Sequence, residues 1–313
     1  MNIEITNDVK MANAITHRGC FHADEVFATI LLILLLKKVV LARISSADEL
    51  PKKLPLNPII YDIGHGVFDH HQPSGNGRRD NGILYSSFGL IWRAYGVRIL
   101  CEHYNCSYKD ALLLFEMIDK DLVQGIDASD NGQIPSCGLS VHIMGISSMV
   151  ASFYPSWDKV NPELEDKCFL QALEFANTIF NNVVSRNIAK LRARDIVEKA
   201  IERSYKNILI LNQFVPWKDW LLTSEHPKAK QILFVVYPSN RNEGYEVMAV
   251  PKRIGSNFFK KTFPLSWAGL TGLDLVKQTK IPFAMFCHSA GFLATAKTFS
   301  SALRMARLAI RCS

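Results

Sequence analysis

Short apolar runs alternate with helix-like segments along the first two-thirds of the chain, and this alternation most strongly limits its fold. The runs with the length and composition of buried strands are residues 14–16, 39–44 and 58–63. Between the first two lies an apolar run at 26–36, which is preceded by Asp24 and Glu25 and followed by two lysines, as the dipole of a buried helix favours. Strands separated by helices predict an α/β domain with a parallel sheet and crossover helices.

The rest of the chain predicts further helices and a second set of strands. Helical patterns follow at residues 86–95, 108–124, 139–153 and 162–203, the last being long enough to connect two domains. Strand-like runs and a final helix come next, at residues 208–211, 231–237, 245–250, 281–288 and 300–311. We therefore predict a parallel-sheet domain with flanking helices over residues 1–200 and a smaller α/β domain over 201–313, with an active-site cleft between them.

Composition limits the class of protein. With 48% hydrophobic and 21% charged residues, the 313-residue chain can form a large core, which excludes disorder throughout its length. Its 36 lysines and arginines against 29 acids give a formal net charge of +7, which favours an anionic partner such as phosphate or nucleic acid. Seven scattered cysteines without a Cys-x-x-Cys pair argue against a disulfide framework or a thiolate zinc finger.

The sequence also lacks the patterns typical of export or membrane insertion. Acidic residues precede any apolar run at the start of the chain, which is not the order of a secretory signal. The apolar run at 26–36 is shorter than the roughly 20 residues that span a bilayer. We therefore expect a cytoplasmic protein without a membrane partner, with the mitochondrion or the nucleus as alternatives in a eukaryotic cell.

Side chains that can bind metal ions gather near two predicted strand ends and after a predicted helix. The set consists of His17, His22, Asp24, Asp62, Asp69, His70, His71, Asp127 and Asp130. In open parallel sheets, ligands bind at the carboxyl ends of the strands. Mixed imidazole and carboxylate ligands suit manganese, magnesium, iron or zinc. A carboxylate that bridges two cations about 3.5–4 Å apart creates a site that activates water and neutralises a phosphate.

A series of motifs, in this order, resembles a known family. The segment Asp69-His70-His71 resembles the signature of the DHH phosphoesterase superfamily. The surrounding motifs resemble the MYG1 family, at residues 16–26, 61–64, 68–72, 85–92, 126–132, 249–251, 256–258, 264–270 and 286–292. The resemblance covers most of the chain and implies a DHH-type catalytic domain and a metal-dependent hydrolase. Eukaryotic members of this family are described as 3′–5′ RNA exonucleases.

The resemblance also implies a role for each matching residue. The implied metal ligands are His17, His22, Asp24, Asp62, His70 and either Asp127 or Asp130. His22 stands where the superfamily usually has an aspartate, and Asp62 matches the bridging carboxylate. The implied catalytic residues are Asp69 and His71, with His71 facing the phosphate or the leaving group. The implied cofactor is a pair of divalent ions, two Mn²⁺ or, alternatively, Mg²⁺ or another divalent ion.

The C-terminal domain is implied to bind substrate, as a DHHA1-like domain that closes over the metal site. His288 lies in a segment where superfamily members often have a glycine-rich turn that contacts phosphate. Arg253, Lys252 and Lys260 are candidate substrate cations beside it in the same domain. Two other features are expected to be structural rather than sites for nucleic acid: the aromatic stretch at 85–92 as core, and the basic cluster at 190–194 as a solvated helix face.

Three functions remain as alternatives from the sequence. The first is a metal-dependent phosphodiesterase or exonuclease that acts on RNA or short oligonucleotides through metal-activated water. The second is a small-substrate phosphatase, such as a pyrophosphatase or a nucleotide phosphoesterase, which would use the same metals. The third is a metal-bound regulatory protein without turnover. The substrate is therefore nucleic acid or a small phosphate-containing molecule, and the oligomeric state stays open, with a homodimer as one option.

Overall fold

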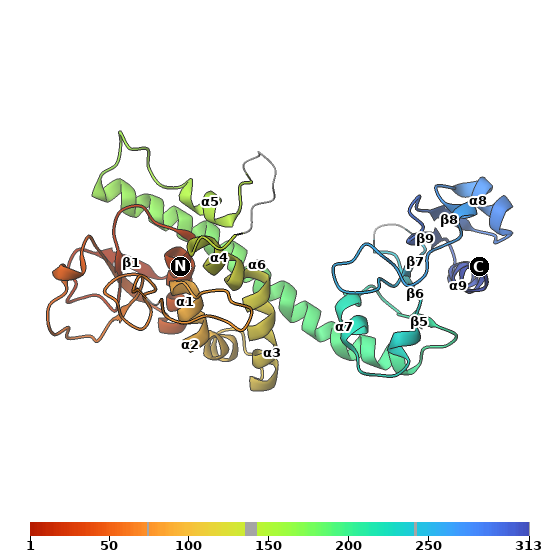
Figure 1. Cartoon of the computed structure of the whole chain (residues 1–313), viewed down its shortest axis with the longest axis horizontal. Coiled ribbons are helices and arrows are strands. Elements are labelled where there is room, and N and C mark those ends of the chain that lie inside the picture. The colour runs from red at the N-terminus through yellow and green to blue at the C-terminus, as the bar shows by residue number, and fades with distance from the viewer. Residues whose placement is uncertain (74, 135–142, 241–242, 313) are drawn as a thin grey trace. The chain divides into compact units, whose positions relative to one another are not determined.

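The computed structural model describes residues 1–73, 75–134, 143–240 and 243–312 (Figure 1). Contacts within the chain divide it into an N-terminal unit, Met1–Ile188, and a C-terminal unit, Ala189–Ser313. The division falls inside one long helix, α6 (Pro162–Glu202), whose bounds differ by one residue from the pattern in the sequence. In the described residues, no helix combines the length and the apolar character needed to cross a membrane.

A four-stranded parallel sheet forms the centre of the N-terminal unit. Its strand order is β1-β3-β2-β4, with bounds β1 (Ile3–Thr6), β2 (Ala14–His17), β3 (Val39–Ile44) and β4 (Ile59–Ile60). All three pairings are parallel, which confirms the predicted sheet. Strand β4 is shorter than the predicted run at 58–63, because Asp62 and Gly64 take positive φ angles of 56° and 87° and the chain turns there. Strand β1 was not predicted.

Helices connect and cover these strands. They are α1 (Ala23–Leu36), α2 (Ser87–Glu102), α3 (Tyr108–Ile118), α4 (Gln124–Asp130) and α5 (Ile146–Ala151), with a 3₁₀ turn η1 (Ala47–Glu49). Helix α1 crosses from β2 to its parallel neighbour β3 and packs against α2. Phe88 and Trp92 on α2 are fully buried core residues, as predicted, whereas Tyr85 at the start of the aromatic stretch is half-buried. Part of the predicted helix at 139–153, residues 139–142, lies outside the described residues.

The predicted helix at 108–124 is divided by a wider turn. Between α3 and α4 the backbone forms a π-helical turn, η2 (Asp119–Val123). The side chain of Asp119 is held there by Arg79, whose Nε and Nη2 donate to it at 2.9 and 2.6 Å. Helix α4 follows this turn directly, so Asp127 and Asp130 lie within a helix, whereas the sequence predicted that they follow one. Such π-helical turns are frequent near functional sites.

The C-terminal unit contains a mixed five-stranded sheet. Its order is β5-β6-β7-β9-β8, with bounds β5 (Ile208–Ile210), β6 (Phe234–Pro238), β7 (Tyr245–Ala249), β8 (Ala284–Cys287) and β9 (Leu293–Ala296). Its helices and 3₁₀ turns are α7 (Lys218–Thr223), η3 (Ala229–Gln231), η4 (Leu265–Trp267), α8 (Gly272–Thr279) and α9 (Phe299–Arg311). Strand β9 and helices α7 and α8 were not predicted.

Alternate residues of β6 enter two separate cores. Phe234 and Val236 pack in a cluster with residues of α9, whereas Val235 and Tyr237 pack in a cluster with Val197 near the end of α6. This alternation is the period-two pattern of a strand that is covered on both faces. The C-terminal unit therefore has its own hydrophobic core.

Candidate metal centre

The parallel sheet brings two of the candidate side chains to the same edge. Strands β2 and β4 are neighbours, and Ile15 pairs with Ile60, so their carboxyl ends lie side by side. His17 is the last residue of β2, and Asp62 follows β4 by two residues. The left-handed φ of 56° at Asp62 is unusual for a residue other than glycine, and such strain is commonly retained at functional sites.

His17 has one ring nitrogen fixed by the backbone and the other directed at carboxylates. Its Nδ1 lies 3.0 Å from the carbonyl oxygen of Arg18, and its Nε2 lies 3.0 Å from Glu25 Oε1 and 3.2 Å from Asp62 Oδ2. Burial acts to lower the pKa of His17, but hydrogen bonds with Asp62 and Glu25 outweigh it and raise the pKa to about 11. A ring held in this way through Nδ1 leaves Nε2 as the atom that a metal ion would take.

Asp24 is the side chain that most strongly indicates that this cluster can hold a cation. Its carboxylate is fully buried, and neither oxygen has a hydrogen-bond partner among the described residues. Burial raises the pKa of Asp24 well above its usual value, and the charges of Asp62, Asp130 and Glu25 raise it further. A buried carboxylate without a partner is costly, and a bound divalent cation would satisfy it.

The candidate ligands form four overlapping groups, within each of which the ligand atoms lie within 4.8 Å of one another. The groups are Asp62-Asp69-His70-His71, His17-His22-Glu25, His22-Asp24-Asp130 and Asp24-Glu25-Asp62. Four residues, His22, Asp24, Glu25 and Asp62, each belong to two groups, so the groups share side chains as a two-ion site requires. The donors are imidazoles and carboxylates without a thiolate, so the set fits Mn²⁺, Mg²⁺ or a similar divalent ion.

The structure separates the two carboxylates of α4 that the sequence left as alternatives. Asp130 Oδ2 lies 2.8 Å from His70 Nε2, and the other ring nitrogen of His70 lies 3.3 Å from Asp62 Oδ1. Asp130 is thus part of the cluster. Asp127 belongs to none of the four groups found among the described residues.

Asp127 is instead paired with residues that hold the helices together. Its Oδ2 lies 2.8 Å from Arg79 Nη1, while its Oδ1 accepts from Ser86 Oγ at 2.7 Å and from the backbone N–H of Gly89 at 3.0 Å. Burial raises the pKa of Asp127 to about 6, although Arg79 and Ser86 act to lower it. The carboxylate therefore connects α4 to the first turn of α2. From that turn, Ser87 Oγ donates to Asp62 Oδ1 at 2.9 Å.

Asp69 and His71 form a pair at the opening of the site. Asp69 accepts from the backbone N–H groups of His65 at 2.7 Å and His71 at 3.0 Å, and the ring Nδ1 of His71 lies 2.9 Å from it. Burial acts to raise the pKa of Asp69, but these hydrogen bonds lower it overall. The His71 side chain is 54% exposed, and it lines a cavity of about 310 Å³ together with His17, His22 and Asp62. An anion from solvent can therefore reach the cluster.

Glu25 is a member of the cluster that sequence reasoning missed. It is fully buried, and its Oε2 accepts from the backbone N–H of His22 at 2.7 Å while Oε1 faces His17. In the sequence it was interpreted only as an acid that complements the dipole of α1. Its position directly after Asp24, in the same motif, was the signal that could have identified it.

The four predicted substrate-binding residues all lie in the C-terminal unit. His288 Nδ1 accepts from the backbone N–H of Ala290 at 3.0 Å. Burial lowers the pKa of Lys260, and its ammonium donates to the backbone carbonyls of Ala229, Lys230 and Ile232. The ammonium of Lys260 is therefore already engaged by the backbone, whereas Lys252 and Arg253 are exposed and form no ion pair with any described carboxylate.

Comparisons with known proteins agree with the motifs. Residues 13–310 match the model of an uncharacterised protein family, UPF0160, also called MYG1 exonuclease. The MYG1 protein of Schizosaccharomyces pombe is 31% identical over 326 residues, which cover 98% of each chain. The MYG1 protein of Saccharomyces cerevisiae is 31% identical, with 96% of each chain covered, and the human MYG1 exonuclease is 27% identical, with 93% of this chain and 84% of its own covered. No solved structure is significantly similar to the chain.

Proposed function

Because this chain belongs to the MYG1 family (UPF0160), we propose that it is a metal-dependent phosphodiesterase that removes nucleotides from the end of RNA or short oligonucleotides. The mammalian relatives are named exonucleases. The observation that carries the proposal is the buried, unpartnered carboxylate of Asp24 among three further carboxylates, beneath a cavity that solvent enters.

The proposed ligands are those that the structure brings together. They are His17, His22, Asp24, Glu25, Asp62, His70 and Asp130, among which Asp62 would be the carboxylate shared between two ions, as the family resemblance implies. Two bound Mn²⁺ ions, or Mg²⁺ in their place, would lower the pKa of a water molecule and neutralise the charge of the phosphate. Asp127 is assigned a structural role, because its oxygens are already held by Arg79, Ser86 and Gly89.

Asp69 and His71 are proposed to act on the substrate side of the cluster. The carboxylate of Asp69 fixes His71 Nδ1, so the opposite ring nitrogen, Nε2, projects toward solvent at the opening. In its protonated form that nitrogen can donate a hydrogen bond to a phosphate oxygen, or a proton to the 3′ oxygen of the shortened chain as its bond to phosphorus breaks. Asp69 is thus a positioning residue, and His71 is the residue that contacts the substrate.

Hydrolysis of defined substrates with Mn²⁺ tests this function. We expect a 5′-labelled single-stranded RNA to be shortened stepwise from its 3′ end, and chelation with EDTA to abolish the reaction. Asp62→Asn should reduce the rate by at least about a hundredfold, since it removes the shared ligand. Asp158→Asn, at an exposed turn away from the cluster, is the matched control and should leave the rate unchanged.

The same assay discriminates between the alternatives. Hydrolysis of pyrophosphate or free nucleotides without any cleavage of RNA or oligonucleotides would contradict the exonuclease proposal and favour a small-substrate phosphatase. Absence of any hydrolysis while Mn²⁺ is shown to be bound, for example by electron paramagnetic resonance, would favour a metal-bound regulatory protein.

A further inference from the structure

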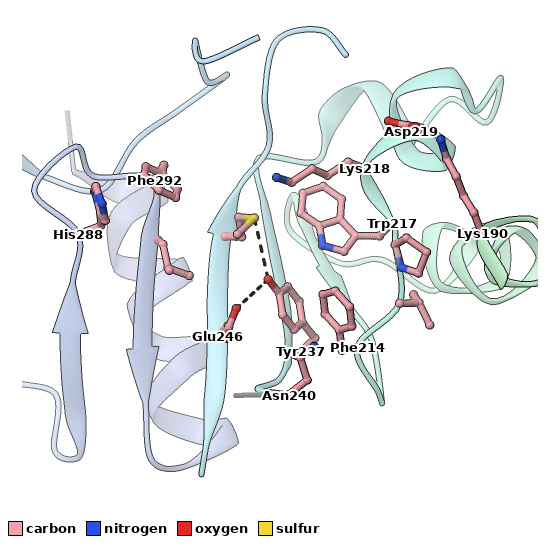
Figure 2. Close-up of a pocket in the computed structure, with 14 residues that line it drawn as sticks. Lys190, Phe214, Trp217, Lys218, Asp219, Tyr237, Asn240, Glu246, His288 and Phe292 are labelled. Atoms are coloured by element: carbon pink, nitrogen blue, oxygen red, sulfur yellow. Dashed lines mark hydrogen bonds and ion pairs between the residues drawn. The ribbon is translucent and has the colours of Figure 1, made fainter. Parts of the chain in front are cut away.

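Two cavities of the C-terminal unit adjoin one another and share part of their walls. The first has a volume of about 750 Å³ and is drawn in Figure 2. The second, of about 560 Å³, shares Lys218, Asp219 and Phe292 with it. Each volume lies in the range of small-molecule sites, which is roughly 300–1,000 Å³. Neither cavity includes a residue of the metal cluster.

Aromatic rings line both sides of the first cavity. Figure 2 shows Phe214, Trp217 and Tyr237 on one side, and His288 and Phe292 on the other. Trp217 and Tyr237 are only 2% and 1% exposed, so they support the wall, whereas Phe214 is 46% exposed and offers an open face. Stacking of a base on an exposed aromatic ring is the usual way in which single-stranded nucleic acid is bound without sequence preference.

The carboxylates that line the first cavity are already engaged. Asp219 forms an ion pair with Lys190. Glu246 accepts from the hydroxyl groups of Tyr237 at 3.0 Å and Ser239 at 2.8 Å. The charge of Asp219 is therefore offset by Lys190, whereas both carboxylate oxygens of Glu246 are held by neutral hydroxyl groups.

Of the remaining polar side chains in the first cavity, Lys218 and His288 can donate, and Asn240 can both donate and accept. Lys218 extends between the two aromatic sides in Figure 2, and no carboxylate of the described chain lies within ion-pair distance of its ammonium group. His288 accepts from Ala290 through Nδ1, which leaves the proton of the neutral ring on Nε2 as a second donor. A ligand with aromatic rings and negative charge matches these walls.

The second cavity continues from Lys218 and Phe292 along an exposed loop. Its lining includes Gly255, Ser256 and Asn257, and Phe259 stacks on Phe292 with ring centroids 5.4 Å apart and an interplanar angle of 8°. Phe292 thus stands between the two cavities. Lys218, the charged residue common to both that has no ion-pair partner in the described chain, lies at their junction.

We propose that the two cavities bind two successive nucleotides of a single-stranded chain, with Lys218 holding the phosphate between them. One base would stack on Phe214 in the first cavity, and the next would occupy the second cavity beyond Phe292. This proposal rests on the proposed function in that it takes nucleic acid as the substrate. It adds a site that binds a chain of two or more nucleotides more tightly than a mononucleotide. Only such a chain fills both cavities and presents a linking phosphate to Lys218.

Calorimetric titration of the full chain in EDTA, without hydrolysis, tests the proposal. The probes are adenosine, adenosine monophosphate and the dinucleotide pApA. We expect the dinucleotide to bind at least about tenfold more tightly than the mononucleotide, because it gains a second base contact and the phosphate contact. Equal affinity of the dinucleotide and the mononucleotide would overturn the two-cavity arrangement.

Two variants locate the binding. Lys218→Ala should weaken dinucleotide binding at least about fivefold and reduce the magnitude of its salt slope by about 0.7, as expected for one lost phosphate contact on a single strand. Lys277→Ala is the matched control, because this exposed lysine of α8 lines neither cavity and should change nothing. Phe214→Leu, which retains an apolar side chain without an aromatic face, should weaken the mononucleotide and the dinucleotide alike. Equal behaviour of the two lysine variants would contradict the role of Lys218.

This binding experiment can fail separately from the activity experiment. If the chain degrades RNA with Mn²⁺ but Lys218→Ala binds pApA as the wild type does, the proposed function stands and the two-cavity site is wrong. If the chain binds pApA through Lys218 in EDTA but degrades no nucleic acid with Mn²⁺, the site stands and the exonuclease function is wrong.

Discussion

Asp24 has a different effect on the protein before and after a metal ion binds. Without a cation it is a buried carboxyl group, crowded by Asp62, Asp130 and Glu25 and without a hydrogen-bond partner in the described chain. We expect Asp24→Asn to raise the free energy of unfolding in EDTA by up to about 1 kcal/mol, because it removes this repulsion. The same substitution should reduce the additional stability that Mn²⁺ confers. Urea denaturation with and without Mn²⁺ measures both effects, and a loss of stability in EDTA would contradict this account.

Asp127 and Asp130 are one turn apart on α4 and are expected to respond differently to the same substitution. Asp130→Asn should weaken Mn²⁺ binding about 10–100-fold with little change in stability in EDTA, because its carboxylate faces the cluster. Asp127→Asn should lower the free energy of unfolding by about 1–3 kcal/mol, because Arg79 loses a buried partner. Isothermal titration with Mn²⁺ and urea denaturation give the two readouts. The reverse pattern would make Asp127 the ligand.

At the scale of elements, the first turn of α2 packs closely against Asp127 of α4 because Gly89 has no side chain. A Cβ atom there would lie 1.9 Å from Asp127 Oδ2 and 2.7 Å from its Cγ. Gly89→Ala should therefore destabilise the protein by about 3 kcal/mol or more, since the helices must separate or the buried carboxylate must leave its partners. Urea denaturation in EDTA measures this loss.

Gly125 on α4 provides the matched control for this substitution. No atom lies within 4 Å of the position that its Cβ would occupy, and its backbone is helical. Gly125→Ala should leave stability unchanged or raise it by up to about 1 kcal/mol, the usual difference in helix propensity. Equal destabilisation by both substitutions would show that the contact between Gly89 and Asp127 is unimportant.

The elements that the sequence predicted well are those governed by local pattern. Strand β3 coincides with the apolar run at 39–44, and α6 with its helical pattern, because hydrophobic periodicity alone defines them. The early end of β4 depends on the turn at Asp62, and the break between α3 and α4 accompanies the pairing of Asp119 with Arg79. That arginine lies far away along the chain, in a glycine-rich loop, so no local pattern could reveal the pair.

The candidate site likewise contains residues that the sequence identified and residues that only the structure could distinguish. The parallel topology identified His17 and Asp62 as candidates, because both follow strand ends, and the resemblance to the family motif identified His70 and His71. The choice between Asp127 and Asp130 required three-dimensional contacts, since both are acids on one helix. The assignment of each residue as a ligand stays a prediction until metal binding is measured.

At the scale of the whole molecule, the two units are expected to respond separately to metal. Every residue of the metal cluster lies in the N-terminal unit, and the C-terminal unit has its own core. Mn²⁺ at a hundred times its dissociation constant should stabilise the N-terminal unit by about 2.7 kcal/mol. Hydrogen exchange followed by mass spectrometry should show slower exchange in peptides from residues 1–188 and unchanged exchange in those from 203–312. Equal slowing in both units, or no difference from Asp62→Asn, would contradict this expectation.

The unpartnered carboxylate of Asp24 is expected to influence the steady-state abundance of this protein in a cell. A chain made while its divalent ion is scarce would lack the stabilisation that a bound ion adds and would open more often, which exposes it to proteolytic degradation. Its steady-state abundance should therefore follow the supply of that ion, with no change in transcription needed. Nutrient conditions could in this way set the level of the protein directly through its turnover.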